Sequence, residues 1–196
     1  MSKYMNSVEH KKELYCTPPH ITKALLRREI FGPRIWEPAA GRGHIVRVLR
    51  ECGYEDVVAS DLHDWGSGYD QRDFLISEME CDSLVTNPPY SLAHQFVCHA
   101  KRVVTHKFAM LLPIQFDFTR AWMDRHERDR VFPLKAWYGF LNSIPWENFD
   151  QTPGLRKHAW FVFERGFKGE IIREKIVFRK TRAGGGAVGV ERGDRC

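Results

Sequence analysis

Between residues 34 and 112, short apolar runs alternate with segments whose apolar residues recur at helical spacing. This alternation constrains the fold most, because each run suits one buried strand and each longer segment suits one helix. Strands that alternate with helices predict a parallel sheet with helices on both faces, which defines an α/β protein. The expected strands are 34–38, 57–61, 73–75, 83–86 and 107–112, and the expected helices are 44–52 and 92–104.

The flanking segments depart from this rhythm. Thr17 precedes two prolines and is predicted to cap a helix that runs through 21–30. Residues 116–132 predict another helix. Two aromatic-rich segments, 135–141 and 159–164, predict an antiparallel hairpin at the edge of the sheet. The last segment, 170–179, predicts either one more strand or a stretch along the surface.

A chain of 196 residues suits one domain. We predict a flexible N-terminal segment at 1–14, a domain at 15–180 and a disordered Gly-rich tail at 181–196. No apolar run approaches the ~20 residues that a membrane span needs, and the N-terminus has no apolar signal region. We therefore expect a cytoplasmic protein without a membrane partner, associated with the nucleoid if it is bacterial.

The cysteine and histidine positions bear on disulfides and metal sites, and the net charge bears on the kind of partner. The five cysteines form no C-x-x-C motif, and His94 and His99, five residues apart, do not share a helix face. A disulfide framework and a metal site are therefore not expected. The net charge of +5 and the pI near 9.0 favour an anionic partner such as nucleic acid.

A glycine turn follows the first expected strand of the sheet. Gly41 and Gly43 allow a tight turn and close approach of a ligand, although Val46 stands where a dinucleotide fingerprint has its third glycine. Glu37 comes just before the turn, and Asp61 ends the next strand, where a carboxylate accepts hydrogen bonds from ribose hydroxyls in nucleotide sites. The alternatives are a purely structural turn and a capping role for Asp61.

The tetrapeptide Asn87-Pro88-Pro89-Tyr90 follows the fourth expected strand. Its two prolines fix consecutive φ angles, so the loop is rigid. It brings together a polar amide, an exposed carbonyl and an aromatic ring, which are the groups that a planar base with an amino substituent needs. A rigid turn between strand and helix is the alternative.

Together these segments resemble the amino methyltransferases that modify adenine in DNA, over about residues 15–165. The segment 15–18 resembles the N-terminal cofactor segment of that family, and 37–43 resembles its main cofactor motif. Asp61 matches the ribose-binding acid, 73–75 resembles the segment that flanks the cofactor's adenine, and 87–90 is the family's catalytic tetrapeptide. The stretch that runs from 144–146 through 158–163 is similar to small phage-type DNA methyltransferases.

The resemblance implies a Rossmann-like methyltransferase fold with a seven-stranded, mostly parallel sheet in the order 3-2-1-4-5-7-6, the seventh strand antiparallel. It implies S-adenosylmethionine as the cofactor and no metal. The implied catalytic residues are Asn87, Pro88, Pro89 and Tyr90. The implied cofactor-binding residues are Tyr15, Thr17, Pro18, Glu37, Pro38, Ala39, Gly41, Gly43, Asp61, Leu62, Asp73, Phe74 and Asn87.

The implied partner is DNA, with the target base extruded from the duplex. Tyr90 is expected to stack on that base, and the segment 142–158 is a candidate for DNA contact, as is the basic segment 179–182. The loop residues proposed to contact DNA are Trp146, Phe149, Arg156 and Lys157. The alternative for this loop is that it covers the core. No segment has the size of a target-recognition domain, so the resemblance implies short or relaxed specificity and an orphan or phage-borne role.

Three alternatives share these motifs. The first is an adenine methyltransferase that acts on RNA. The second is a glutamine methyltransferase that acts on a protein, since the same tetrapeptide occurs in enzymes that modify release factors. The third is a nucleic-acid-binding module whose methyltransferase core is inactive.

Overall fold

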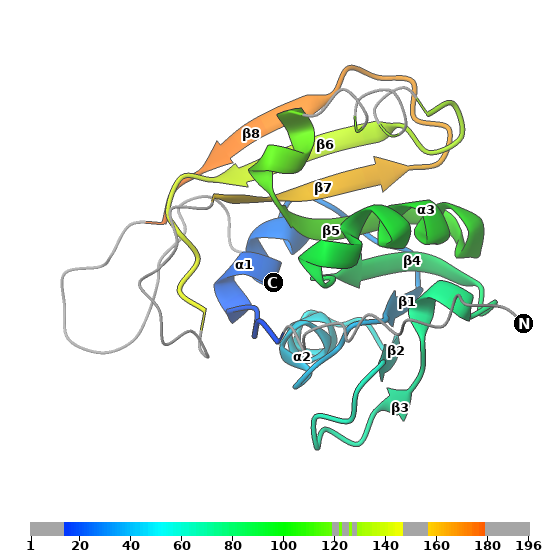
Figure 1. Cartoon of the computed structure of the whole chain (residues 1–196). Coiled ribbons are helices and arrows are strands. Elements are labelled where there is room, and N and C mark those ends of the chain that lie inside the picture. The colour runs from blue at the N-terminus through cyan, green and yellow to red at the C-terminus, as the bar shows by residue number, and fades with distance from the viewer. Residues whose placement is uncertain (1–13, 119–121, 123–125, 127–128, 147–156, 179–196) are drawn as a thin grey trace, which may run out of the picture.

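The computed structural model describes residues 14–118, 122, 126, 129–146 and 157–178. Its centre is an eight-stranded sheet in the order β3-β2-β1-β4-β5-β7-β6-β8 (Figure 1). The strands are β1 (Arg34–Glu37), β2 (Asp56–Asp61), β3 (Asp70–Gln71), β4 (Cys81–Thr86), β5 (Val104–Pro113), β6 (Leu134–Phe140), β7 (His158–Glu164) and β8 (Ile172–Ile176).

The order of the first seven strands is the expected one, and β7 is the antiparallel strand. It pairs antiparallel with β5 on one side and with β6 on the other. Two expectations were incomplete. The sheet has eight strands, since β8 pairs parallel with β6. The hairpin is therefore not at the edge, because β7 lies inside the sheet and β8 covers the outer side of β6.

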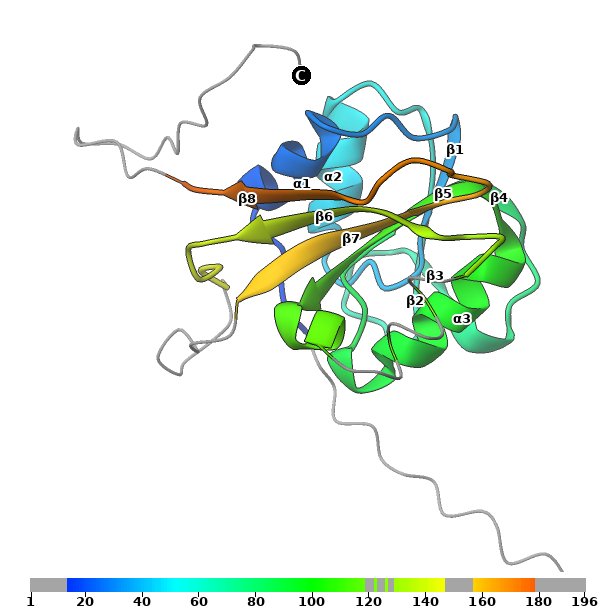
Figure 2. The same cartoon turned by 90° about the horizontal axis from the view of Figure 1, so that it is seen from above.

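Helices cover both faces of the sheet. Helices α1 and α2 lie on one face and α3 lies on the other (Figure 2). Two separate clusters of buried side chains pack between the sheet and the helices, one on each face. The helices are α1 (Pro19–Leu26), α2 (His44–Glu51) and α3 (Ala93–Val103), and the 3₁₀ turns are η1 (Phe74–Ile76), η2 (Tyr90–Leu92) and η3 (Ile114–Phe118).

The two clusters arise because successive side chains of a strand point to opposite faces. In β5, Phe108 and Met110 join the α3 side, whereas Ala109 and Leu111 join the α1 and α2 side. The strand is buried on both faces, which explains why it reads as a continuous apolar run in the sequence.

Three local expectations were wrong. Thr17 does not cap α1, which begins after Pro18 without a side-chain cap and ends at Leu26. Residues 74–76 form η1 rather than a strand, because the Asp73 carboxylate accepts a hydrogen bond from Leu75 N and caps the turn. The third strand is instead the two-residue β3, which pairs with the end of β2.

Other expectations lie mainly outside the described residues. The predicted helix at 116–132 is described only in part, where η3 occupies its first residues. The N-terminal segment before Leu14 and the tail after Phe178 are not described. None of the helices in the described part of the chain has the length and apolar character that a membrane crossing requires.

A buried charged cluster, which the sequence did not indicate, joins the end of α1 to the sheet. Glu29 is 2% exposed. Its carboxylate accepts hydrogen bonds from Lys107 at 2.8 Å, from Lys135 at 3.0 Å and from the Tyr138 hydroxyl at 2.9 Å. Both lysines also contact Glu164, at 2.9 and 2.8 Å. The cluster therefore links the residues after α1 to β5, β6 and β7.

Candidate active site

A pocket opens where the strand order reverses, at the carboxyl ends of β1, β2 and β4. From β1 the chain proceeds outward through β2 and β3, then returns to β4 on the other side of β1. In α/β sheets such a reversal leaves a crevice where ligands bind. The glycine turn after β1 and the tetrapeptide after β4 both contribute to the pocket wall. The prediction that these two motifs meet at one crevice is confirmed.

Most of the residues predicted to bind the cofactor line this pocket. The predicted residues in the lining are Tyr15, Thr17, Pro38, Ala39, Gly41, Asp61, Leu62, Asp73, Phe74, Asn87, Pro88 and Pro89. Pro18, Glu37, Gly43 and Tyr90 lie outside the lining. Pro18 precedes α1, and each of the other three is adjacent in sequence to a residue of the lining. Direct contact of these four with a ligand stays a prediction.

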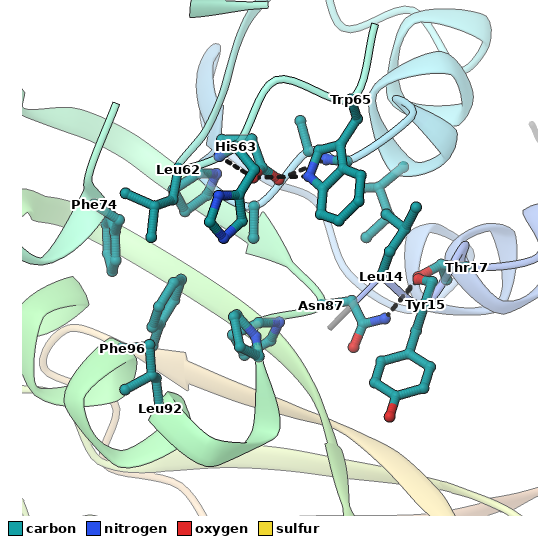
Figure 3. A pocket seen from close by; sticks show the side chains of 18 of the residues that line it. Leu14, Tyr15, Thr17, Leu62, His63, Trp65, Phe74, Asn87, Leu92 and Phe96 are labelled. Carbon is teal, nitrogen blue, oxygen red and sulfur yellow. Dashed lines mark hydrogen bonds between the residues drawn. The ribbon is translucent and has the colours of Figure 1, made fainter. Parts of the chain in front are cut away.

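The two ends of the pocket differ in character (Figure 3). Leu62, Phe74 and Phe96 gather at one end, which is apolar and suits a flat aromatic group. Tyr15 and Asn87 lie at the other end. A ligand that fills the pocket therefore places an apolar ring at one end and its far end beside the Asn87 amide.

Asp61 organises the wall between these two ends. One carboxylate oxygen accepts a hydrogen bond from Gly41 N at 2.8 Å, and the other accepts from His63 N at 2.9 Å and from Trp65 Nε1 at 3.0 Å. A carboxylate offers about four acceptor positions, so these three donors leave about one. One acceptor position therefore remains for a donor from a ligand, and a second would require the Trp65 indole to release its hydrogen bond.

The glycine turn is held in a conformation that other residues rarely adopt. Gly41 has a φ of 53° and Gly43 a φ of 76°, both in the left-handed region. A Cβ on Gly43 would also collide with the Tyr69 side chain. The two glycines therefore serve the turn geometry and the close packing behind it.

Glu37 connects the two motifs from beneath the pocket. It is fully buried, and its Oε1 accepts hydrogen bonds from Ala39 N at 3.0 Å and from Thr86 Oγ1 at 2.5 Å. Thr86 directly precedes Asn87, so the carboxyl joins the glycine turn to the tetrapeptide. Burial raises the pKa of Glu37 to about 8, against the lowering effect of its two hydrogen bonds. The carboxyl is therefore mostly protonated at neutral pH.

Asn87 is oriented by its own amide hydrogens. Its Nδ2 donates to Tyr15 O at 3.2 Å and to Thr17 Oγ1 at 3.1 Å (Figure 3). A backbone carbonyl only accepts hydrogen bonds, so the amino group must face Tyr15 and the oxygen must face away. That oxygen, Oδ1, is buried and has no hydrogen-bond partner among the residues that the structure describes. The fold thus leaves a strong acceptor unused at the polar end of the pocket.

Four aromatic rings gather beside the tetrapeptide. Tyr90 stacks on Tyr15 with ring centroids 5.5 Å apart and planes 12° apart, and His158 lies 5.4 Å from Tyr90. Trp146 contacts Tyr15 at 5.6 Å and His158 at 5.2 Å. One face of Tyr90, which was predicted to stack on a base, is therefore covered by Tyr15.

The predicted DNA-contacting loop is only partly described. Trp146 belongs to the aromatic group, and Lys157 donates to Ser143 Oγ at 3.3 Å. Phe149 and Arg156 lie outside the described residues, as does the basic segment 179–182. Contact of these residues with a nucleic acid stays a prediction.

Several pocket residues were not predicted from the sequence. Trp65 and His63 follow Asp61 by a few residues and carried no motif, although an aromatic residue shortly after a predicted ribose-binding acid is a usable signal. Leu75 directly follows the predicted pair Asp73-Phe74. Phe96 and Leu14 reach the pocket through the packing of α3 and of the N-terminal segment, which no local pattern encodes.

The expectation that the histidines form no ligand-like group was wrong. His94, Cys98 and His126 bring one potential ligand atom each within 4.8 Å of one another. Cys98 lies one helical turn after His94, a spacing that can be read from the sequence, whereas His126 joins the group only through tertiary packing.

The fold is shared with solved methyltransferase structures. One is a putative RNA methyltransferase from Pyrococcus horikoshii, with a TM-score of 0.58 and 14% identity over 79% of this chain and 89% of the other. Another is a modification subunit of a putative type I restriction enzyme from Vibrio vulnificus YJ016, with a TM-score of 0.59 and 13% identity over 89% of this chain and 49% of the other, so this chain spans about half of it.

A third is magnesium protoporphyrin IX methyltransferase from Synechocystis PCC 6803 with bound SAH, with a TM-score of 0.53 and 10% identity over 74% of this chain and 80% of the other. No family model and no curated protein sequence matches this chain. At these identities the likenesses establish architecture. The chain has the Rossmann-like methyltransferase fold, as predicted.

Proposed function

We propose that this chain is an S-adenosylmethionine-dependent methyltransferase that modifies the exocyclic amino nitrogen of adenine in DNA. The observation that carries the proposal is the buried Oδ1 of Asn87, a residue of the pocket lining, which has no hydrogen-bond partner in the described part of the chain. Leaving a buried acceptor unsatisfied costs roughly 1–3 kcal/mol, so it calls for a donor from a ligand. An amino group on a planar base supplies that donor.

The pocket fits the proposed cofactor in three respects. Its apolar end accepts an adenine ring between Leu62 and Phe74, and Asp61 offers an acceptor for a ribose hydroxyl. The glycine turn, at φ angles that favour glycine, allows the chain to approach the ligand closely. When bound, S-adenosylmethionine supplies an electrophilic methyl group on a sulfonium. The structures that share the fold include methyltransferases, one of them with bound SAH, which supports the same choice.

The chain's own groups prepare the target nitrogen. Its lone pair is delocalised into the ring, so the nitrogen is a poor nucleophile. Asn87 Oδ1 and the Pro88 carbonyl accept its two hydrogens, which favours a pyramidal nitrogen whose lone pair points at the methyl group. The N–C bond forms as the C–S bond breaks, and the surplus proton leaves to solvent. Orientation of this kind contributes on the order of 7–11 kcal/mol to such reactions.

Acidic residues act in binding rather than as general bases. The positive charge on the sulfur disappears during transfer, so an anion close to it would stabilise the ground state more than the transition state. Glu37 agrees with this assignment, because burial raises its pKa to about 8 and keeps it mostly neutral at neutral pH. Asp61 lies on the wall that faces the ribose.

DNA is the proposed substrate because the tetrapeptide resembles that of DNA adenine methyltransferases and the chain has a net charge of +5. A duplex base must be extruded first, at a cost of a few kcal/mol. Tyr15 covers one face of Tyr90, so a base that stacks on that face must displace Tyr15. Stacking contributes roughly 1–3 kcal/mol per base and offsets part of the cost. RNA is the second candidate, because one structure with this fold is a putative RNA methyltransferase.

Incubation of the full chain with methyl-labelled cofactor and unmethylated DNA tests the proposal. Parallel reactions contain RNA of the same sequence or a glutamine-containing release-factor peptide. After digestion, mass spectrometry of the nucleosides should find N6-methyladenine from the DNA reaction. If label appears only in the RNA or only in the peptide, that molecule replaces DNA as the proposed substrate. Cofactor binding by calorimetry without any transfer would indicate a binding module, and no saturable binding would reject the proposal altogether.

A further inference from the structure

Three side chains with metal-binding atoms meet on the face of the sheet that α3 covers. His94 and Cys98 lie one helical turn apart on α3, so they share a face of that helix. His126 comes from the segment after β5 and is 1% exposed. One potential ligand atom of each lies within 4.8 Å of the other two. Cys98 is exposed, so the group is reached from solvent.

The two imidazoles already point at one another. His126 Nε2 lies 2.9 Å from His94 Nδ1, and the rings meet edge to face with centroids 4.7 Å apart. Trp122 packs on His126 with centroids 4.5 Å apart. The two imidazoles are therefore held in place by their contact with each other and, for His126, by the Trp122 ring.

We propose that His94, Cys98 and His126 bind a divalent transition-metal ion, with zinc the best fit, and that a fourth position faces solvent. Two imidazoles and a thiolate are the donors that zinc takes in proteins, whereas magnesium and calcium take oxygen ligands. The helical spacing of His94 and Cys98 supplies two ligands from one rigid element. This site is separate from the pocket and does not depend on the proposed methyl transfer.

Binding requires small, definable changes. Two nitrogen ligands of a tetrahedral zinc ion lie about 3.3 Å apart, given bonds of 2.0–2.1 Å. The imidazoles must therefore separate by a few tenths of an ångström from their present 2.9 Å. The Cys98 thiol loses its proton to solvent, so uptake of one ion releases one proton and becomes tighter as pH rises.

Lys101 competes with the ion. Its Nζ lies 3.2 Å from His126 Nδ1 and 2.7 Å from Asp129 Oδ2. A lysine ammonium only donates, so the proton of neutral His126 is then on Nε2, the atom that would bind the ion. Metal binding moves this proton to Nδ1 and requires Lys101 to turn wholly towards Asp129. Removing the lysine cation should therefore strengthen binding.

Metal titration of the chelator-treated full chain tests the site. We expect one equivalent of Zn²⁺ by equilibrium dialysis, and Co²⁺ should give thiolate-to-cobalt charge-transfer absorption. Cys98→Ser should abolish the absorption, and His94→Gln should abolish stoichiometric binding. The controls are Cys52→Ser, a cysteine just after α2 on the opposite face of the sheet, and His106→Gln, an exposed histidine on β5. Both should bind as the unchanged chain does.

Lys101→Met makes the test directional, since it keeps much of the apolar stem and removes the charge. It should bind Zn²⁺ about tenfold more tightly, because repulsion from a neighbouring cation is lost. Absence of stoichiometric binding by the folded chain would overturn the proposal. Binding that Cys98→Ser and His94→Gln leave unchanged would also overturn it, because the ion would then lie elsewhere. A weaker affinity in Lys101→Met would contradict the competition.

Discussion

Asn87 and Asp61 occupy the same pocket wall but hold different kinds of hydrogen-bonding groups. Asn87 Oδ1 is a buried acceptor without a partner among the described residues, and the Asp61 carboxylate accepts a hydrogen bond from the glycine turn. In the proposed function, the first receives a donor from the substrate and the second binds the ribose of the cofactor. Their roles should separate experimentally.

Asn87→Ala should reduce kcat for methyl transfer by at least about 100-fold, the usual effect of losing one hydrogen-bonding group that acts on the reacting centre. Cofactor affinity should change little. Asp61→Ala should do the reverse and raise the dissociation constant of the cofactor by about 10-fold or more, since charge-assisted hydrogen bonds contribute roughly 1.5–3 kcal/mol. Calorimetry gives the affinities, and single-turnover transfer gives the rates.

Thr17→Val is the control for Asn87→Ala. It removes one of the two acceptors of the Asn87 amide, and Tyr15 O remains as the other. Its rate should fall only several-fold. If both Asn87→Ala and Asp61→Ala lose binding and rate equally, the assigned roles are wrong.

Glu37 predicts a specific dependence of stability on pH. Its folded pKa is raised to about 8 from a reference value of 4.5. Between these values the folded state holds more protons than the unfolded state, so the contribution of Glu37 to stability falls as pH rises and is lost above about 8. Glu37→Gln cannot ionise. Relative to the unchanged chain, this variant should become more stable as pH increases from about 6 to about 9.

Urea denaturation at several pH values measures this difference in the free energy of unfolding. Asp70→Asn is the matched control, because Asp70 is an exposed carboxylate on β3. Its difference from the unchanged chain should stay nearly constant over the same range. A constant difference for Glu37→Gln as well would mean that the carboxyl is ionised when the pocket is free of ligand.

Among the structural elements, the glycine turn before α2 depends on two separate constraints. Gly43 and Gly53 both have positive φ angles, of 76° and 90°. A Cβ meets the Tyr69 side chain at Gly43 and nothing within 4 Å at Gly53. These two positions therefore separate backbone strain from steric collision.

Gly53→Ala should destabilise the chain by about 1–2 kcal/mol, the cost of a side chain in the left-handed region. Gly43→Ala should cost about 1–3 kcal/mol more, because Tyr69 must also move. It should weaken cofactor binding, whereas Gly53→Ala should not. Chemical denaturation and calorimetry check both. Equal destabilisation by the two substitutions would mean that Tyr69 yields freely.

The alternation of apolar runs was sufficient to predict the central elements of the fold. Strands β1, β2, β4 and β5 and helices α2 and α3 were found because each buries a periodic set of side chains. Strand β3 escaped prediction because its two residues are exposed and carry no pattern. The run at 73–75 was apolar because Phe74 is buried, but the Asp73 cap makes it a turn.

For the pocket, the motifs predicted which residues meet but not how they hold one another. Asn87 and Asp61 were found as chemically distinctive residues at strand ends. The hydrogen bond between Thr86 and Glu37, and the bonds from Asn87 to residues 15 and 17, join segments far apart in the sequence. Side-chain pairings of this kind depend on tertiary packing, which local periodicity does not encode.

Across the whole molecule, the cluster around Glu29 joins the residues after α1 to β5 and β6 directly, and to β7 through Glu164. Removing one partner of a buried ionic group leaves the others uncompensated, which typically costs 3–5 kcal/mol. Glu29→Gln should therefore lower the free energy of unfolding by about 3 kcal/mol or more. Differential scanning calorimetry and urea titration measure the change.

Glu51→Gln is the comparison at the surface. Glu51 pairs with Lys23 at 3.4 Å in an exposed position. Exposed ion pairs contribute about 0–1 kcal/mol, so this variant should be nearly as stable as the unchanged chain. If the two variants lose similar amounts of unfolding free energy, the Glu29 cluster contributes no more to stability than an exposed ion pair.

The hydrogen bonds from Asn87 to Tyr15 and Thr17 also make the two halves of the crevice thermodynamically linked. A nucleoside that immobilises residues 14–17 fixes the rotation of the amide at the same time. Binding of the first ligand orders part of the site, so the second ligand loses less conformational entropy when it binds. This is positive heterotropic cooperativity. Reciprocity requires each ligand to tighten the other by the same factor. If the chain is the methyltransferase proposed above, the demethylated cofactor should therefore dissociate faster once the modified strand has left.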